Sequence, residues 1–186
     1  MKHAEKLEFD INLGEFKFEE CTLHREYTKL QRYGRGLSGI AFGSETKYIK
    51  DVDHFLKQLP KQLLDIEVPY VFLLDIKTPD QDCAVLPAHI DINKTCGINV
   101  YLQVNGEVTK FYNWDADTRL CSYVEEFCAQ PGEVWLMNNQ QPHSVDLVRG
   151  RQRRILTYSF VKTPYNVVLE ILNANHNTKR QIDPGI

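Results

Sequence analysis

The sequence predicts a mainly β fold, a sandwich or jelly roll with flanking helices. Short apolar stretches of strand length recur along the chain, and turn sequences such as Asn105-Gly106, Pro131-Gly132 and Gly150 separate them. Many short strands at even spacing are typical of sandwiched or closed antiparallel sheets. Two stretches show the spacing of three and four residues that marks an amphipathic helix, so helices are expected beside the sheets.

The N-terminal part of the chain is expected to contribute early strands and one helix. Segments 7–14 and 15–20 alternate apolar and polar residues, which predicts two strands. Residues 21–45 are mixed, basic and glycine-bearing, and loop with short strand is expected there. Apolar side chains in segment 51–65 recur at helical spacing, which predicts a helix that Pro60 ends or kinks.

The rest of the chain is expected to be a series of strands followed by a helix. The predicted strands occupy residues 68–77, 83–91, 97–104, 107–114, 122–129, 133–139, 143–148 and 153–161. After Pro164, apolar residues recur at helical spacing, and a helix is expected because proline suits the first helical turn. Residues 175–186 are polar and are expected to fray.

A single domain is expected over residues 1–186, because no repeat, low-complexity tract or linker divides the chain. Residues 1–80 would supply N-terminal strands and a supporting helix. Residues 81–162 would form the β core with the candidate metal site, and residues 163–186 the C-terminal helix and tail. This length is enough to bury a hydrophobic core.

Composition narrows the function classes. A formal net charge of −3 argues against a general binder of nucleic acid or membrane surfaces. The chain shows no apolar run of membrane-spanning length and no secretory signal, so a cytoplasmic protein is expected. The cysteines lack the pair spacings of a zinc site and are interpreted as reduced thiols. They are Cys21, Cys83, Cys96, Cys121 and Cys128.

Two histidines and one carboxylate form the most informative pattern. His89 and Asp91 are separated by one residue in a predicted strand, so their side chains project from the same face. His143 begins a later strand, and it completes a group of three if the two strands lie side by side. Imidazole and carboxylate ligands suit ferrous iron, and such a group leaves coordination positions open.

A basic residue beyond His143 adds a second pattern. Arg153 shares strand parity with Thr157 and Ser159, whereas Arg154 faces the opposite way. Whichever arginine faces the interior needs a carboxylate partner, because burying an unpaired charge is costly. The planar guanidinium binds a carboxylate through two parallel hydrogen bonds, and Thr157 or Ser159 is placed to add a hydroxyl. Strand parity alone leaves both Arg153 and Arg154 open as the anion anchor.

The segments HID, PHSV and RRILTYSF together resemble the Fe(II)/2-oxoglutarate-dependent oxygenases. The resemblance covers roughly residues 84–161 and implies a double-stranded β-helix, the cupin-like form of the jelly roll. It implies that His89, Asp91 and His143 bind iron and that Arg153 binds the far carboxylate of 2-oxoglutarate. The segment PGEVWLMNNQQPHSV is most similar to the branch with aspartyl/asparaginyl and free-proline hydroxylases.

The resemblance also implies a reaction. Fe(II), 2-oxoglutarate and O2 would give succinate, CO2 and a hydroxylated product, and the retained Asp91 argues against halogenation. The substrate is expected to be a small molecule or peptide, either an amino acid or a protein side chain. Asn99 and Tyr101 lie on a neighbouring predicted strand, where they would hydrogen-bond the cosubstrate or pack inside the barrel.

Two other function classes stay open. One is a cupin-like metalloenzyme that binds a metal but not 2-oxoglutarate. The other is a noncatalytic β-sandwich module that binds a partner. A nucleic-acid patch at Arg149, Arg151, Arg153 and Arg154 is not expected, because strand alternation sends these side chains in different directions.

Overall fold

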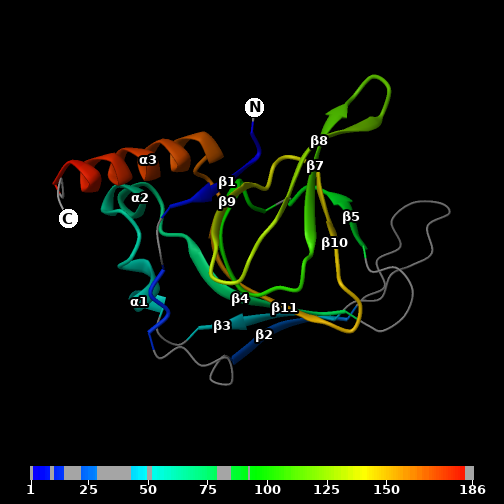
Figure 1. Cartoon of the computed structure of the whole chain (residues 1–186), viewed down its shortest axis with the longest axis horizontal. Helices are drawn as coiled ribbons and strands as arrows, with labels where there is room; N and C mark the ends of the chain where they lie inside the picture. Colours follow the sequence, from blue (N-terminus) through cyan, green and yellow to red (C-terminus); the bar gives the residue numbers. More distant parts are fainter. Residues whose placement is uncertain are drawn as a thin grey trace.

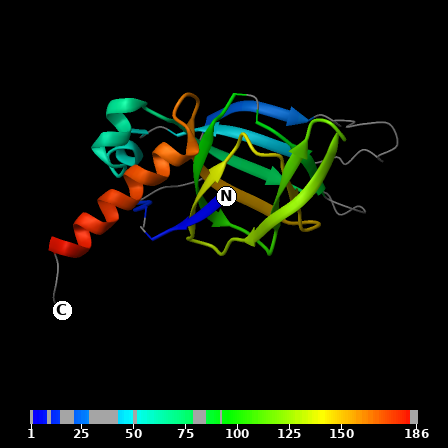
Figure 2. The same cartoon turned by 90° about the horizontal axis from the view of Figure 1, so that it is seen from above.

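The structure of the protein is a computed structural model. It describes residues 2–8, 11–14, 22–28, 43–49, 52–78, 85–91 and 93–182. Two antiparallel sheets face each other, and helices pack to one side of them (Figure 1, Figure 2). The strand predicted for residues 15–20 lies outside the described residues, as do Cys21 and Cys83.

The described secondary structure is mostly β. The strands are β1 (Ala4–Leu7), β2 (Thr22–Thr28), β3 (Gly43–Tyr48), β4 (Tyr70–Lys77), β5 (Val85–His89), β6 (Cys96–Gln103), β7 (Val108–Asp115), β8 (Leu120–Cys128), β9 (Val134–Asn138), β10 (His143–Asp146) and β11 (Gln152–Phe160). The helices are α1 (Val52–Leu56), α2 (Lys61–Ile66) and α3 (Tyr165–Ile182).

The order of the strands identifies the architecture. The larger sheet runs β1-β9-β6-β11-β4-β3-β2 and the smaller one β5-β10-β7-β8. From β4 to β11 the chain crosses repeatedly between the sheets, and within that run only β7 and β8 are consecutive strands of one sheet. This winding is a double-stranded β-helix, so the predicted fold class is confirmed. Its first strand, β4, begins at Tyr70, before the predicted core boundary at residue 81.

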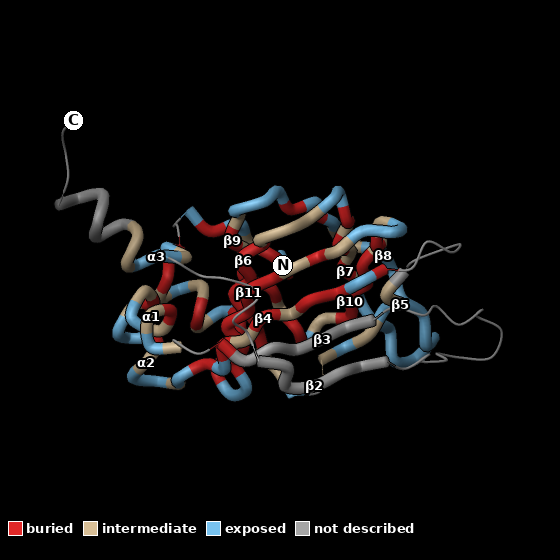
Figure 3. Tube along the Cα trace, turned by 90° about the horizontal axis from the view of Figure 1, so that it is seen from below, coloured by how far each residue is buried: buried red, intermediate tan, exposed pale blue. Residues whose placement is uncertain are grey.

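One face of the larger sheet is buried beneath the helices. Ile98 of β6 and Leu156 of β11 pack there with Phe55, Leu63 and Val168, which belong to the three helices. Buried residues gather along β6, β11 and β4 (Figure 3). Most residues of β6 and β11 are buried on both faces, although one face of β11 carries the polar residues Arg153, Thr157 and Ser159.

A second apolar cluster fills part of the space between the sheets. Its buried members come from strands of both sheets and from the turn after β8. They are Ala4, Tyr101, Phe111, Phe127, Ala129, Met137 and Ile155. This interior is the space into which the candidate site faces.

Two predicted boundaries were wrong. A strand was predicted for residues 7–14, but the strand covers Ala4–Leu7, because this segment pairs with β9 and forms the edge of the larger sheet. Residues 175–186 were expected to fray, yet α3 continues to Ile182. Asn175 helps to hold this helix, since its amide donates to the Ile171 carbonyl oxygen at 2.9 Å and lies 3.4 Å from Gln62 Oε1 on α2.

The helices near Pro60 follow the sequence pattern. The predicted helical segment divides into α1 and α2, and α2 begins directly after Pro60. Among the described helices, none combines the length and the apolar character that crossing a membrane requires.

Glu67 ties the end of α2 to the turn after β11. Its carboxylate accepts hydrogen bonds of 2.8 Å from the backbone N–H of Val161, from the backbone N–H of Thr163 and from the Thr163 hydroxyl. Burial would raise the pKa of Glu67, but these hydrogen bonds outweigh it and hold the pKa below the ordinary value. The folded state therefore favours the charged carboxylate.

We expect Glu67→Gln to lower the free energy of unfolding by about 1–2 kcal/mol near neutral pH, because hydrogen bonds to a charged acceptor are stronger than those to an amide. A carboxyl whose pKa is lowered by folding stabilises the fold above its unfolded pKa and loses this effect as pH falls through the folded pKa. The difference should therefore shrink below pH 4.5, the ordinary pKa value. Urea unfolding at several pH values measures it.

The matched control is Glu170→Gln, since Glu170 is exposed on α3. This change should leave the free energy of unfolding within about 0.5 kcal/mol of the unaltered chain. A Glu67→Gln effect that does not depend on pH would contradict the expected role of the charged carboxylate.

Candidate metal centre

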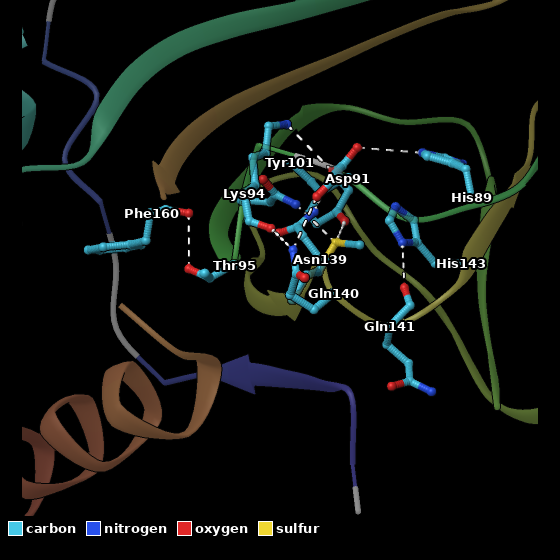
Figure 4. Close-up of polar contacts among 12 residues, drawn as sticks. His89, Asp91, Lys94, Thr95, Tyr101, Asn139, Gln140, Gln141, His143 and Phe160 are labelled. Carbon is cyan, nitrogen blue, oxygen red and sulfur yellow. Dashed lines mark hydrogen bonds and ion pairs between the residues drawn. The ribbon is translucent and has the colours of Figure 1, made fainter. Parts of the chain in front are cut away.

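The structure brings His89, Asp91 and His143 together at the space between the two sheets (Figure 4). One ligand atom from each of them lies within 4.8 Å of the others. The Nε2 atom of His89 is 3.7 Å from Oδ1 of Asp91, and the ring centroids of the two histidines are 4.4 Å apart. The predicted meeting of the two strands is therefore present.

Strand pairing sets this arrangement. His143 at the start of β10 pairs with His89 at the end of β5 on one side and with Phe111 of β7 on the other. The β5–β10 register then shifts, so that Val145 pairs with Leu86. This β-bulge places one extra residue on β5. It allows Leu86 and His89, three residues apart, both to face the interior.

The Asp91 carboxylate is held by its surroundings. Its Oδ2 accepts a 2.7 Å hydrogen bond from Asn139 Nδ2 and lies 3.7 Å from Lys94 Nζ. Burial would raise the pKa of Asp91, but Lys94, His143, His89 and the Asn139 hydrogen bond lower it below its ordinary value. The carboxylate is thus charged near neutral pH, as a metal ligand must be.

His143 is buried and oriented by the segment before it. Its Nδ1 lies 3.0 Å from the Gln141 carbonyl oxygen. Because a carbonyl oxygen only accepts hydrogen bonds, Nδ1 carries the proton and the lone pair of Nε2 is left for a ligand. Burial, assisted by nearby His89, lowers the pKa of His143, so the ring is neutral and suited to metal binding.

Of the two arginines that strand parity left open, Arg153 lies in the interior. Its side chain is buried, its guanidinium is 5.4 Å from the ring centroid of Tyr101, and one terminal nitrogen is 3.5 Å from Thr109 Oγ1. Among the described residues, Arg153 Nε has no hydrogen-bond partner. Arg154 points to the other face of β11, where its Nε lies 3.4 Å from buried Asp75. The two neighbouring arginines therefore have different surroundings.

The other candidate residues lie on the same interior face as Arg153. Asn99 donates to Met137 Sδ at 3.0 Å, and the Tyr101 hydroxyl contacts the same sulfur at 3.4 Å. Thr157 and Ser159 are buried on β11, where Thr157 pairs with Asn99. Burial raises the pKa of Tyr101 despite the nearby Arg153 cation, so its hydroxyl stays protonated and can donate.

Sequence reasoning missed the polar residues around the three candidate ligands. Lys94 and Asn139 contact Asp91, Gln140 bonds the loop that carries Asp91, and Gln141 orients His143. One signal was present in the sequence, since four consecutive amides stand directly before Pro142 and His143. The hydrogen-bond partners of these amides lie in another part of the chain, so the amides alone did not predict which residues they contact.

Comparisons with known proteins find only distant structural likeness. No family model and no curated protein matches the chain. A Pseudomonas putida prolyl-4-hydroxylase is 20% identical with a TM-score of 0.43, over 78% of this chain and 79% of that one. An oxidoreductase of the 2OG-Fe(II) oxygenase family from Burkholderia pseudomallei is 11% identical with a TM-score of 0.42, over 76% and 73%.

A third structure shows how broad this likeness is. The 7S globulin of Momordica charantia is 11% identical with a TM-score of 0.38, over 64% of this chain. The present chain spans only 30% of the length of that globulin. None of these likenesses indicates a function, which depends on the residues of the site.

Proposed function

We propose that the protein is an iron oxygenase that uses 2-oxoglutarate and O2 to hydroxylate an amino acid or a protein side chain. One observation carries the proposal. The buried guanidinium of Arg153 lies in the same interior as His89, Asp91 and His143, and its Nε lacks a partner among the described residues. A buried cation is costly without an anion. A dicarboxylate bound at the metal would supply that anion.

The donor set fits ferrous iron. Two neutral imidazoles and one carboxylate are the ligands of the facial triad found in non-haem Fe(II) oxygenases, which leaves open positions. The buried thiol of Cys96 does not compete, because it contacts the Thr163 carbonyl oxygen at 3.4 Å and burial raises its pKa to about 12. Soft thiolate ligation, which would favour zinc or copper, is therefore not offered by this cysteine.

Each residue has a defined task in this proposal. His89, Asp91 and His143 would hold the metal, and Arg153 would bind the far carboxylate of 2-oxoglutarate, with the Tyr101 ring beside its guanidinium. When bound, ferrous iron supplies the chemistry that converts O2 and 2-oxoglutarate to succinate and CO2 and hydroxylates the substrate. The protein orients the reactants and limits the access of water.

The substrate would approach beside the β7–β8 hairpin. Tyr112 of β7 is linked to the segment before His143, since its N–H donates to the Pro142 carbonyl oxygen and its own carbonyl accepts from Gln141 Nε2. On the same hairpin, Trp114 and Tyr123 are more than half exposed, and Tyr123 pairs with Tyr112. These aromatic side chains suit contact with a small molecule or a peptide. The branch of aspartyl/asparaginyl and free-proline hydroxylases is the proposed affiliation.

Anaerobic calorimetry tests the proposal directly. We expect 2-oxoglutarate to bind only when Fe(II), or Mn(II) as its redox-stable substitute, is present. Succinate formation in air should require both Fe(II) and 2-oxoglutarate. If the folded protein bound 2-oxoglutarate equally well without metal, or not at all, the proposed function would be wrong.

A further inference from the structure

The two carboxylate oxygens of Asp91 have different partners. Oδ1 faces His89, with 3.7 Å between it and Nε2. Oδ2 accepts the 2.7 Å hydrogen bond from Asn139 and lies 3.7 Å from the Lys94 ammonium (Figure 4). The surroundings thus engage one oxygen and direct the other towards the histidines.

The orientation of the Asn139 amide follows from chemistry. A charged carboxylate only accepts hydrogen bonds, so the amide atom that faces it must be the NH2 group. Asn139 is 6% exposed and cannot turn to solvent without moving the chain. Its Oδ1 is buried and has no hydrogen-bond partner among the described residues. The amide is therefore placed for its contact with Asp91 and little else.

Backbone hydrogen bonds fix Asn139 to the same segment as Asp91. The Asp91 N–H donates to the Asn139 carbonyl oxygen at 3.1 Å, and the Asn139 N–H donates to the Thr95 carbonyl oxygen at 3.1 Å. The Gln140 amide donates to the carbonyl oxygens of Asp91 and Lys94. These bonds do not involve the Asn139 side chain, so they persist when it is replaced.

Gly97 leaves the space that this amide occupies. A Cβ atom at Gly97 would lie 3.3 Å from Asn139 Oδ1, which is tighter than most real contacts. Asn139 also stands shortly before His143, whose Nδ1 is oriented by Gln141. One short segment after β9 therefore touches two of the three candidate ligands.

We propose that Asn139 is a positioning residue that holds Oδ2 of Asp91, so that Oδ1 alone is presented to the metal. This role of Asn139 rests on the proposed iron site. A carboxylate that binds through both oxygens takes a further coordination position. By engaging Oδ2, Asn139 with Lys94 beside it keeps that position open for the cosubstrates.

Replacement of Asn139 by leucine tests the inference, because leucine is similar in size and has no donor. We expect Asn139→Leu to weaken Mn(II) binding by about 10–100-fold, the range found when a group that orients a ligand is lost. The visible absorption of the Co(II)-loaded protein should also change shape, because the freed Oδ2 can join the metal. Anaerobic calorimetry and absorption spectroscopy measure the two effects.

The matched control is Asn175→Leu, which removes an amide on α3 that is remote from the metal group. It should leave the Mn(II) affinity and the Co(II) spectrum unchanged. If circular dichroism shows that Asn139→Leu is unfolded, Asn139→Ala is tested by the same two measurements, the Mn(II) affinity and the Co(II) spectrum. If the unaltered chain binds the metal and the folded Asn139 variant shows the same affinity and the same spectrum, the role of Asn139 is overturned but the proposed function is not. No metal binding by the unaltered chain overturns the proposed function with it.

Discussion

The variant His143→Ala is expected to bind Mn(II) or Fe(II) more than about 100-fold more weakly than the unaltered chain. Loss of a ligand should cost more affinity than loss of a group that only orients a ligand, which costs about 10–100-fold. Succinate formation should fall to background. His143 is buried beside His89, and its Nε2 is the ligand atom left free by the bond to Gln141. Calorimetry under anaerobic conditions measures the affinity, and coupled succinate detection measures the turnover.

Two further variants make this result specific. His176→Ala removes a histidine on α3 that lies 3.6 Å from Glu8, and it should change neither quantity. His143→Gln fills more of the volume beside Phe111 than alanine does, so it separates loss of the ligand from loss of packing. If both His143 variants bound the metal as tightly as the unaltered chain, His143 would not be a metal ligand. Retained function of the whole protein would then favour a noncatalytic binding module.

The second large effect is expected for Arg153→Lys. The KM for 2-oxoglutarate should rise by roughly 10–100-fold, because a charged two-point hydrogen-bond pair worth about 1.5–3 kcal/mol is reduced to a single point contact. The Mn(II) affinity should stay unchanged, since no ligand atom is altered. The KM is measured from the rate of succinate formation over a range of 2-oxoglutarate concentrations, and the Mn(II) affinity is measured by calorimetry.

Arg154→Lys is the matched control. It preserves a positive charge opposite buried Asp75 and leaves the interior untouched, so the KM should stay within about two-fold. A rise for Arg154→Lys but not for Arg153→Lys would reverse the assignment of the anchor. If neither variant changed the KM, a cupin-like metalloenzyme that does not use 2-oxoglutarate would be favoured.

The strands of the core were predictable because local signals mark them. Turn residues separate them, and β4 carries the dense apolar run that predicts a strand. The position of β1 was not predictable, because it is set by pairing with β9, far along the chain. The length of α3 was missed for a similar reason, since its polar second half is held by contacts with distant elements.

The candidate site shows the same division. Alternation along one strand was enough to predict that Arg153 and Arg154 differ and that Arg153 shares its face with Thr157 and Ser159. Contacts between distant segments of the chain could not be predicted from local sequence patterns. The hydrogen bond from Asn139 to Asp91 joins two loops, and each residue alone has the character of an ordinary turn residue.

The β-bulge in β5 allows the metal centre to be built on a strand of two different lengths. Leu86 and His89 would face opposite sides of a regular strand, and both face the interior only because the strand holds one extra residue. Pro87 lies within this irregular stretch and has no N–H to give to a ladder. A deletion of one residue between Leu86 and His89 would place them two apart in a regular strand, so the imidazole would still face the interior opposite His143. Functional relatives are therefore expected with either length of β5 between these two positions.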